Sequence, residues 1–183
     1  MSDNTNAITL TSFFEGLRMG DAAAMQLCLH PEVEFRDIGF DLHGRQVHAM
    51  WHMIVSKKIE VSYRDLKVEG DAGTAHWECN YEFRKDAESA PRPVHNVIDS
   101  TFRFEGGLIR TQEDNCDFWT WFEQAMGPVG KAAHALGVVE GGLEDLLKQD
   151  IPLNVEEKLR AKVKKAAGDK IAAFILKHPE YAN

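Results

Sequence analysis

The chain has 183 residues, 44% of them hydrophobic and 27% charged, which suits a globular protein with one core and room for an appendage. Its formal net charge of −8 argues against a nucleic-acid-binding surface, which needs clustered Lys and Arg. The N-terminus resembles no signal peptide, and no apolar run reaches the roughly 20 residues that span a bilayer, so we expect a cytoplasmic protein without membrane partners.

Cysteine usage agrees with a cytoplasmic location. Cys28, Cys79 and Cys116 are odd in number, lie far apart in sequence and match no zinc-binding spacing. We therefore expect reduced and mostly buried thiols.

Three helices are predicted near the N-terminus. Residues 7–19 carry apolar side chains at helical spacing, and Gly20 is placed to end this helix. Asp21 can then cap a short helix over 22–29. Residues 45–57 again show helical spacing, which predicts a third helix with one buried stripe.

Alternating side chains predict a sheet of antiparallel strands. The segments concerned are 33–37, 58–71, 73–84, 94–104 and 108–116, separated by turns or loops that contain Gly or Pro. The alternation in 73–84 is the clearest, and it implies a sheet with one solvated face. Helices followed by meandering strands indicate an α+β fold. The predicted inward residues of the two central strands are Ala75, Trp77, Cys79, Tyr81, Phe83, Asn96, Ile98, Ser100, Phe102 and Phe104.

The C-terminal part changes character. An aromatic-rich helix over 117–128 closes a domain that spans 1–126, and we expect 127–183 to be a helical extension packed on the same domain. Asn154 and Glu157 fit a capping box that would begin the last helix.

Three stretches of the sequence resemble a known superfamily. FFEGLRMGDAAAMQLCLHPEVEFRD, LHGRQVHAMWHMI and HNVIDSTFRFEGGLIRTQEDNCDFWTW are similar to SnoaL-like proteins of the nuclear transport factor two-like superfamily, and the resemblance covers 7–126. It implies a cone-shaped, cystatin-like roll, in which N-terminal helices pack on a curved antiparallel sheet around an apolar pocket. The superfamily includes isomerases, dehydratases, hydrolases, cyclases and non-catalytic modules.

The resemblance also implies where acid–base groups would lie. Asp37 falls at the position of the proton-shuttling aspartate of ketosteroid isomerases, and Asp114 matches the acid–base aspartate of the cyclase branch. Phe13 and Ser100 replace the isomerase's tyrosine and protonated aspartate, and the cyclase's partner histidine also falls near Ser100. The chain therefore departs from the ketosteroid isomerase pattern.

The residues themselves support both aspartates as catalytic candidates. Asp37 shares a strand face with Val33 and Phe35, and a carboxylate in an apolar cavity has a raised pKa suited to proton transfer. The alternative is that Asp37 caps the following loop. If the inner face of the last strand includes Arg110 and Asp114, the pocket floor is polar, and an internal ion pair between the two is the alternative. The full inner set would then be Arg110, Gln112, Asp114 and Cys116.

Further side chains are expected to line the pocket. The predicted ligand-binding residues are Trp51, Trp77, Tyr81, Asn96, Ser100, Gln112 and His52. For the aromatic residues plain core packing is the alternative, but a buried Tyr81 hydroxyl needs a partner and could donate to a ligand. His48 and His52 have a spacing that can bind metal, but no third ligand beyond His43 is nearby, so no metal site is predicted.

Two functions fit this sequence. The first is cofactor-independent acid–base catalysis, of isomerase, cyclase or dehydratase type, on a small hydrophobic carbonyl compound. The second is a non-catalytic module that binds a small ligand or a protein. Because the outer sheet face often pairs in this superfamily, a homodimer is one expected state.

Overall fold

The computed structural model describes residues 2–136 and 155–182 of the chain. Its helices are α1 (Ser2–Met19), α2 (Ala22–Gln26), α3 (Arg45–Val55), α4 (Phe118–Met126) and α6 (Val155–Lys177), followed by the short 3-10 helix η1 (Pro179–Tyr181). Its strands are β1 (Leu29–Arg36), β2 (Asp41–His43), β3 (Glu60–Glu69), β4 (Ala72–Phe83), β5 (Arg92–Glu105) and β6 (Leu108–Asn115). Residues 128–136 are also helical. The predicted α+β class is confirmed.

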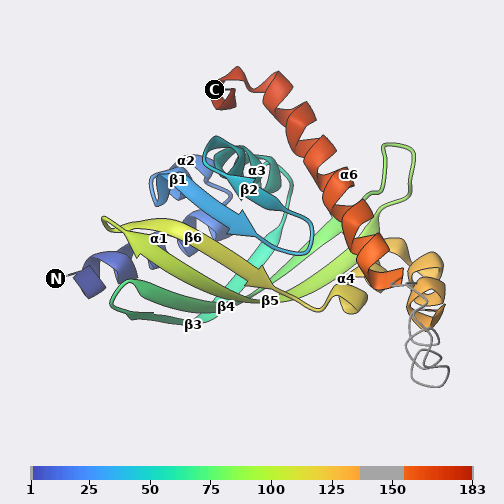
Figure 1. The fold of residues 1–183 in the computed structure, drawn as a ribbon, viewed down its shortest axis with the longest axis horizontal. Helices are drawn as coiled ribbons and strands as arrows, with labels where there is room; N and C mark the ends of the chain where they lie inside the picture. Colours follow the sequence, from blue (N-terminus) through green and yellow to red (C-terminus); the bar gives the residue numbers. More distant parts are fainter. Residues whose placement is uncertain (1, 137–154, 183) are drawn as a thin grey trace, which may run out of the picture.

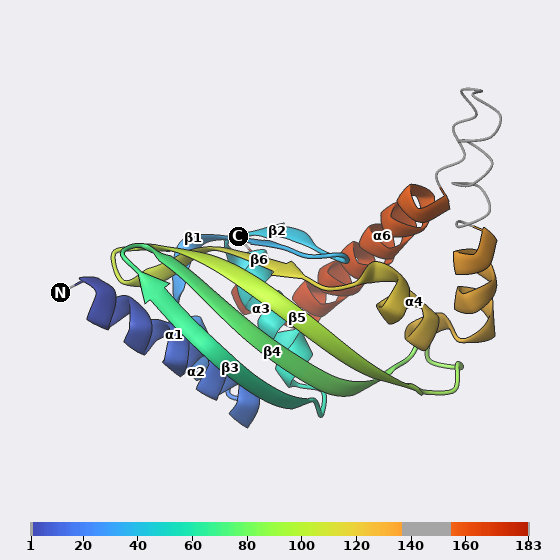
Figure 2. The same cartoon turned by 90° about the horizontal axis from the view of Figure 1, so that it is seen from below.

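The six strands form one curved sheet in the order β2-β1-β6-β5-β4-β3. Figures 1 and 2 show α1, α2 and α3 against one face of this sheet, while the long strands β3, β4 and β5 curve around them. All neighbouring strands are antiparallel except β1 and β6, which run parallel. The sheet is therefore mixed rather than purely antiparallel as predicted.

The first turn regions follow the sequence signals closely. Gly20 ends α1 with a positive φ of 70°, and the Asp21 side chain accepts a hydrogen bond from the Ala24 backbone at the start of α2. The strand β1, however, begins earlier than predicted and runs through Pro31. A break in the pairing with β6 between Leu29 and Glu34 accommodates Pro31, which has no backbone N–H to donate.

The core lies between the helices and the concave face of the sheet. Phe13 and Phe14 of α1 are fully buried, and Phe13 packs edge-to-face against Trp51 of α3 at a centroid distance of 5.3 Å. Trp77 and Phe102 meet Phe14 from β4 and β5 at 6.1 and 6.0 Å. This aromatic packing holds the strands in place around the interior.

The helix α6 lies beside α3 and crosses the end of the sheet, as Figure 1 shows. Ile171 of α6 is 2% exposed within the main core, whereas Leu176 on the same helix is 86% exposed. The capping box predicted from Asn154 lies outside the described residues. Among the described helices, none has the length and apolar character needed to cross a bilayer.

The sheet edges depart from regular strands. The strand β3 has an irregularity in its pairing between Arg64 and Lys67, where Asp65 has a φ of 55°. The part of β5 that precedes Asp99 extends beyond the end of β6. There, the Gln124 side chain of α4 accepts a hydrogen bond from the His95 backbone N–H at 2.7 Å and donates one to its carbonyl at 3.0 Å.

Candidate functional site

Asp114 lies on the inner face of β6 and is 7% exposed. Ser100 is its direct partner across the sheet on β5, and its hydroxyl donates to Asp114 Oδ1 at 2.5 Å. Gln112 Nε2 donates to the same oxygen at 2.9 Å, and Trp77 Nε1 donates to the Ser100 hydroxyl at 2.8 Å. Three strands thus supply one hydrogen-bonded network around a buried carboxyl.

Burial dominates the electrostatics of Asp114. Loss of solvation raises its pKa to about 7, and the nearby charge of Asp37 acts in the same direction. The hydrogen bonds from Ser100 and Gln112 stabilise the ionised form and therefore limit this rise. A carboxyl with a pKa near 7 can both give and accept a proton at neutral pH.

Asp37 follows β1 directly and begins the loop to β2. Its Oδ1 accepts hydrogen bonds from the backbone N–H groups of Gly39 at 2.7 Å and Phe40 at 2.5 Å. These are the loop-capping bonds that the sequence offered as an alternative role. Desolvation nevertheless raises the pKa of Asp37 to about 6, against the effect of those bonds and of Lys164 on α6. Asp37 therefore caps the loop through its Oδ1 and also has the raised pKa that a catalytic carboxyl would need.

Besides His76 Nε2, two buried side-chain polar atoms have no hydrogen-bond partner among the described residues. They are Trp51 Nε1, a donor, and Gln112 Oε1, an acceptor. Trp51 packs against Phe35 at 5.6 Å and Trp77 at 6.5 Å, so its ring belongs to the core next to the network around Asp114. An unsatisfied donor and acceptor in a protein interior are costly, and such atoms often serve a ligand.

Tyr81 and Asn96 lie farther along β4 and β5. The Tyr81 hydroxyl accepts a hydrogen bond from Trp121 Nε1 at 2.8 Å, and burial raises its pKa far above the usual range. The Asn96 side chain is hydrogen-bonded to the thiol of Cys116. Trp121 was not predicted as a site residue, and the sequence offered only the aromatic-rich character of its helix as a signal.

The cysteines match the expectation of unpaired thiols. Cys28 and Cys79 are buried, Cys116 is half-buried, and all three are free. Burial raises the pKa of Cys79 to about 12 and that of Cys116 to about 11, with Asp114 contributing to both. These thiols are therefore protonated at neutral pH and are poor nucleophiles.

The position of Arg110 differs from the polar pocket floor that the sequence suggested. Arg110 does not belong to the inner face of β6 and makes no pair with Asp114. Its guanidinium instead bonds Glu34 at 3.0 Å and Glu105 at 3.4 Å on the outside. A register shift in the pairing of β5 and β6 between Arg103 and Phe104 changes the side-chain parity there.

His52 is not part of the hydrogen-bonded network around Asp114. Its ring contacts Phe174 and His178 at centroid distances of 5.3 and 5.0 Å, and its Nδ1 is 3.0 Å from the hydroxyl of Tyr181. All these partners belong to the C-terminal segment. The structure therefore groups His52 with the end of the chain, whereas Trp77, Ser100 and Gln112 are grouped with Asp114.

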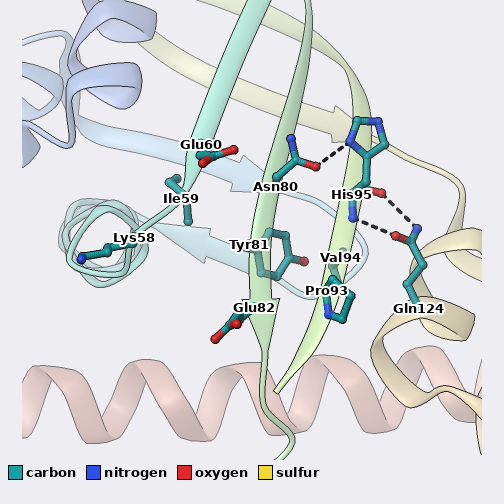
Figure 3. Close-up of a pocket in the computed structure, with 10 residues that line it drawn as sticks. All are labelled: Lys58, Ile59, Glu60, Asn80, Tyr81, Glu82, Pro93, Val94, His95 and Gln124. Carbon is teal, nitrogen blue, oxygen red and sulfur yellow. Dashed lines mark hydrogen bonds between the residues drawn. The ribbon is translucent and has the colours of Figure 1, made fainter. Parts of the chain in front are cut away.

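Two surface hollows of the described residues lie elsewhere on the molecule. One, of about 480 Å³, is formed by the ends of β3, β4 and β5 together with Gln124, and Figure 3 shows Glu60, Asn80 and His95 around it. Tyr81 is the predicted site residue that lines it. A second hollow, of about 860 Å³, lies between Arg92 and the helical residues after Gly127. Neither includes Asp37 or Asp114 among its lining residues.

Comparisons with solved structures place this fold among known ones. An LEH-like epoxide hydrolase of M. tuberculosis is 16% identical with a TM-score of 0.57, and the match covers 74% of this chain and 98% of that one. A candidate polyketide cyclase from a Silicibacter species is 18% identical with a TM-score of 0.56, covering 66% and 95%. An NTF2-like protein of unknown function from Mesorhizobium loti is 17% identical with a TM-score of 0.54, covering 64% and 94%.

These similarities concern the fold, because all three identities are low. They show that this chain shares its fold with these proteins, one of which is described as NTF2-like. No curated protein matches the chain. The family model of the SnoaL-like domain matches residues 10–112, more than half of the sequence, and the chain belongs to the SnoaL-like family.

Proposed function

We propose that this protein is a cofactor-independent acid–base enzyme that moves a proton on a small hydrophobic carbonyl compound. One observation carries the proposal, namely the buried carboxyl of Asp114, which is held by Ser100 and Gln112 and has its pKa raised to about 7. A general acid or base works best when its pKa lies near the working pH. Isomerases, cyclases and dehydratases all need such a group.

In this proposal a second carboxyl, that of Asp37, acts together with Asp114 in proton transfer. Asp37 has its pKa raised to about 6, and its charge affects Asp114, so the pair can hold one proton between them near neutral pH. In the proposed reaction the ionised member removes a proton from the carbon next to the substrate carbonyl. The protonated member then donates to the oxygen or to a second carbon.

The proposed substrate is apolar because the interior is. Trp51, Trp77 and Phe35 surround the network, and displacement of these rings would admit an aliphatic or aromatic skeleton of modest size. The unpartnered Trp51 Nε1 is a donor that a substrate carbonyl oxygen could accept from, and the unpartnered Gln112 Oε1 could accept from a hydroxyl.

The test is proton exchange at carbon. Hydrophobic ketones and aldehydes incubated with the protein in D₂O are followed by NMR for deuterium uptake next to the carbonyl. We expect Asp114→Asn to slow the exchange of a responsive compound by roughly 10²–10⁴-fold. Glu113→Gln is the matched control, because its exposed side chain lies on the opposite face of β6. Equal exchange rates for Asp114→Asn and the wild type would refute the proposed role.

A non-catalytic binding module is the second candidate. The bonds from Gly39 and Phe40 are those of a loop-capping aspartate, and aromatic rings fill the interior beside Asp114, as a module without catalysis would have them. In that case a small apolar ligand would raise the melting temperature of the wild type and of Asp114→Asn by the same amount. No compound would then show deuterium exchange above the rate in buffer.

A further inference from the structure

Two histidines and a glutamate come together where the end of the chain docks onto α3. His52 lies in the last turn of α3, His178 directly follows α6, and Glu180 belongs to η1. One ligand atom from each, two imidazole nitrogens and a carboxylate oxygen, can be chosen so that all lie within 4.8 Å of one another. This spacing suits donors around a single ion bound at about 2.0–2.2 Å from each ligand.

Neighbouring side chains fix the orientation of the two imidazoles. The His178 ring stacks on Phe174 at a centroid distance of 4.0 Å and an interplanar angle of 17°. The His52 ring meets the same Phe174 edge-on at 5.3 Å. Both rings are half-buried, so packing on one shared aromatic residue restricts the motion that a free surface histidine would have.

Tyr181 provides an outer contact to one ligand. Its hydroxyl lies 3.0 Å from His52 Nδ1 and accepts a hydrogen bond from Gln26 Nε2 at 2.6 Å. With its proton on Nδ1 and donated to the Tyr181 oxygen, the imidazole keeps the lone pair of Nε2 for a cation. Metal-binding histidines commonly hold their second ring nitrogen in this way.

The polypeptide around these side chains is anchored independently. Arg45 Nη1 donates to the backbone carbonyls of Glu180 and Ala182, in each case at 3.2 Å. The carboxylate of Glu180 already lies 3.0 Å from His178 Nδ1. The donors are therefore brought together without an ion, which lowers the ordering cost of binding one.

From this geometry we propose that His52, His178 and Glu180 form a binding site for a first-row divalent metal ion, of which zinc is the favoured member. Two imidazoles and one carboxylate select zinc, cobalt, nickel or copper over magnesium and calcium, which prefer sets of oxygen ligands. Three protein ligands leave the remaining coordination positions to water. The ion joins the C-terminal segment to α3 and so stabilises the docking of α6. This site is separate from Asp114 and does not depend on the proposed function.

The test uses the full chain without a polyhistidine tag, stripped of metal by a chelator and then titrated with zinc chloride by calorimetry. We expect one equivalent to bind, and a melting temperature raised by roughly 5 °C when zinc exceeds its Kd about 100-fold. Magnesium chloride at the same concentration is expected to give no shift. Cobalt(II) should produce visible absorption bands of an ion bound by nitrogen and oxygen ligands.

Matched variants distinguish this site from nonspecific zinc binding by exposed histidines. Glu180→Gln and His178→Gln should weaken zinc binding at least tenfold and cut the melting shift at the same zinc concentration to about half or less. His43→Gln should change neither, since His43 is exposed on β2 and outside the cluster. Because Glu180 is exposed, we expect Glu180→Gln to fold normally in the absence of zinc, so its zinc binding can be measured. Unchanged zinc affinity in both cluster variants would overturn the proposal, as would loss of binding in His43→Gln alone.

Discussion

At the scale of single residues, the chemistry of the interior centres on the surroundings of Asp114. The carboxyl accepts two hydrogen bonds from neutral donors, Ser100 and Gln112, and no cation bonds it in the described part of the chain. Neutral donors offset only part of the cost of burying a charge. The protonated form of Asp114 is therefore favoured in the folded protein far more than in the unfolded chain.

This preference predicts how stability depends on pH. The pKa of Asp114 is raised from 3.8 to about 7, so the folded state binds more protons than the unfolded state between those values. The contribution of Asp114 to the free energy of unfolding should therefore fall as pH rises from 4 to 7 and level off above. Asp37, with a pKa raised to about 6, adds to the same trend.

Urea unfolding of the wild type and of Asp114→Asn across this pH range measures the effect. We expect the variant to flatten the dependence, by an amount on the order of 4 kcal/mol at most, because asparagine stays neutral and can still accept from Ser100 and Gln112. The exposed neighbour Glu113→Gln should retain the wild-type slope. Parallel pH profiles for the wild type and Asp114→Asn would contradict the assigned pKa direction.

Much of this site could be predicted from residue order alone. Strand alternation placed Trp77 and Ser100 on the inner face correctly, because side chains of a regular strand alternate strictly, whereas Asp114 was inward in only one of the two alternatives left open. The alternative that put Arg110 on the same inner face as Asp114 is wrong, since a single register shift reverses parity and leaves no signal in composition. The grouping of His52 with residues near 180 was beyond prediction, because it depends on where α6 docks.

At the scale of elements, α3 shows how a glycine can set the start of a helix. Gly44 precedes α3 with φ 50° and ψ −124°, a combination that residues with a Cβ avoid. Its N–H donates to the Val33 carbonyl at 2.7 Å, and an added Cβ would lie 3.2 Å from the Pro31 carbonyl oxygen. The turn from β2 into α3 thus requires glycine for backbone and contact reasons together.

We therefore expect Gly44→Ala to lower the free energy of unfolding by about 1–3 kcal/mol. The control is Gly168→Ala, which lies within α6 with no atom within 4 Å of an added Cβ. Alanine favours a helix over glycine, so Gly168→Ala should be neutral or stabilise by up to ~1 kcal/mol. Urea denaturation measures both changes. Equal decreases in the free energy of unfolding of the two variants would show that backbone strain at Gly44 does not cause the loss of stability.

The long helices and strands followed from the sequence, but their ends and short partners did not. The pattern in 73–84 predicted β4 closely, since twelve residues alternate without interruption. The three-residue strand β2 was predicted only as loop, because three residues are too few to show a period. Pairing with β1 rather than any local preference makes it a strand.

At the scale of the whole molecule, the attachment of α6 decides whether the chain behaves as one unit. Ile171 joins the main core, and an added Cβ at Gly39 would meet Val163 and Ala167 of α6 at 3.8 Å. The helix therefore covers the loop that Asp37 begins. The division into a domain of 1–126 and an extension stays a prediction. Substitutions of a buried and an exposed residue of α6 can test whether the two parts unfold together.

Ile171→Ala should lower the free energy of unfolding by about 2–4 kcal/mol, since it removes a buried side chain from the core. Leu176→Ala on the same helix is the matched control, because an 86% exposed side chain should contribute less than ~0.5 kcal/mol. Thermal unfolding should remain a single transition in both proteins. A second, earlier transition in Ile171→Ala would show that α6 unfolds independently.

The side chain of Gln124 has a consequence for self-association. An uncovered length of β5 would present free amides and carbonyls as a template for another copy of the chain, which is how many sheets begin to aggregate. Gln124 satisfies both backbone groups of His95 in place of a neighbouring strand. At the far edge, the irregular pairing at Asp65 interrupts β3. The molecule can therefore keep long, strongly curved strands while giving amyloid-like stacking few places to start.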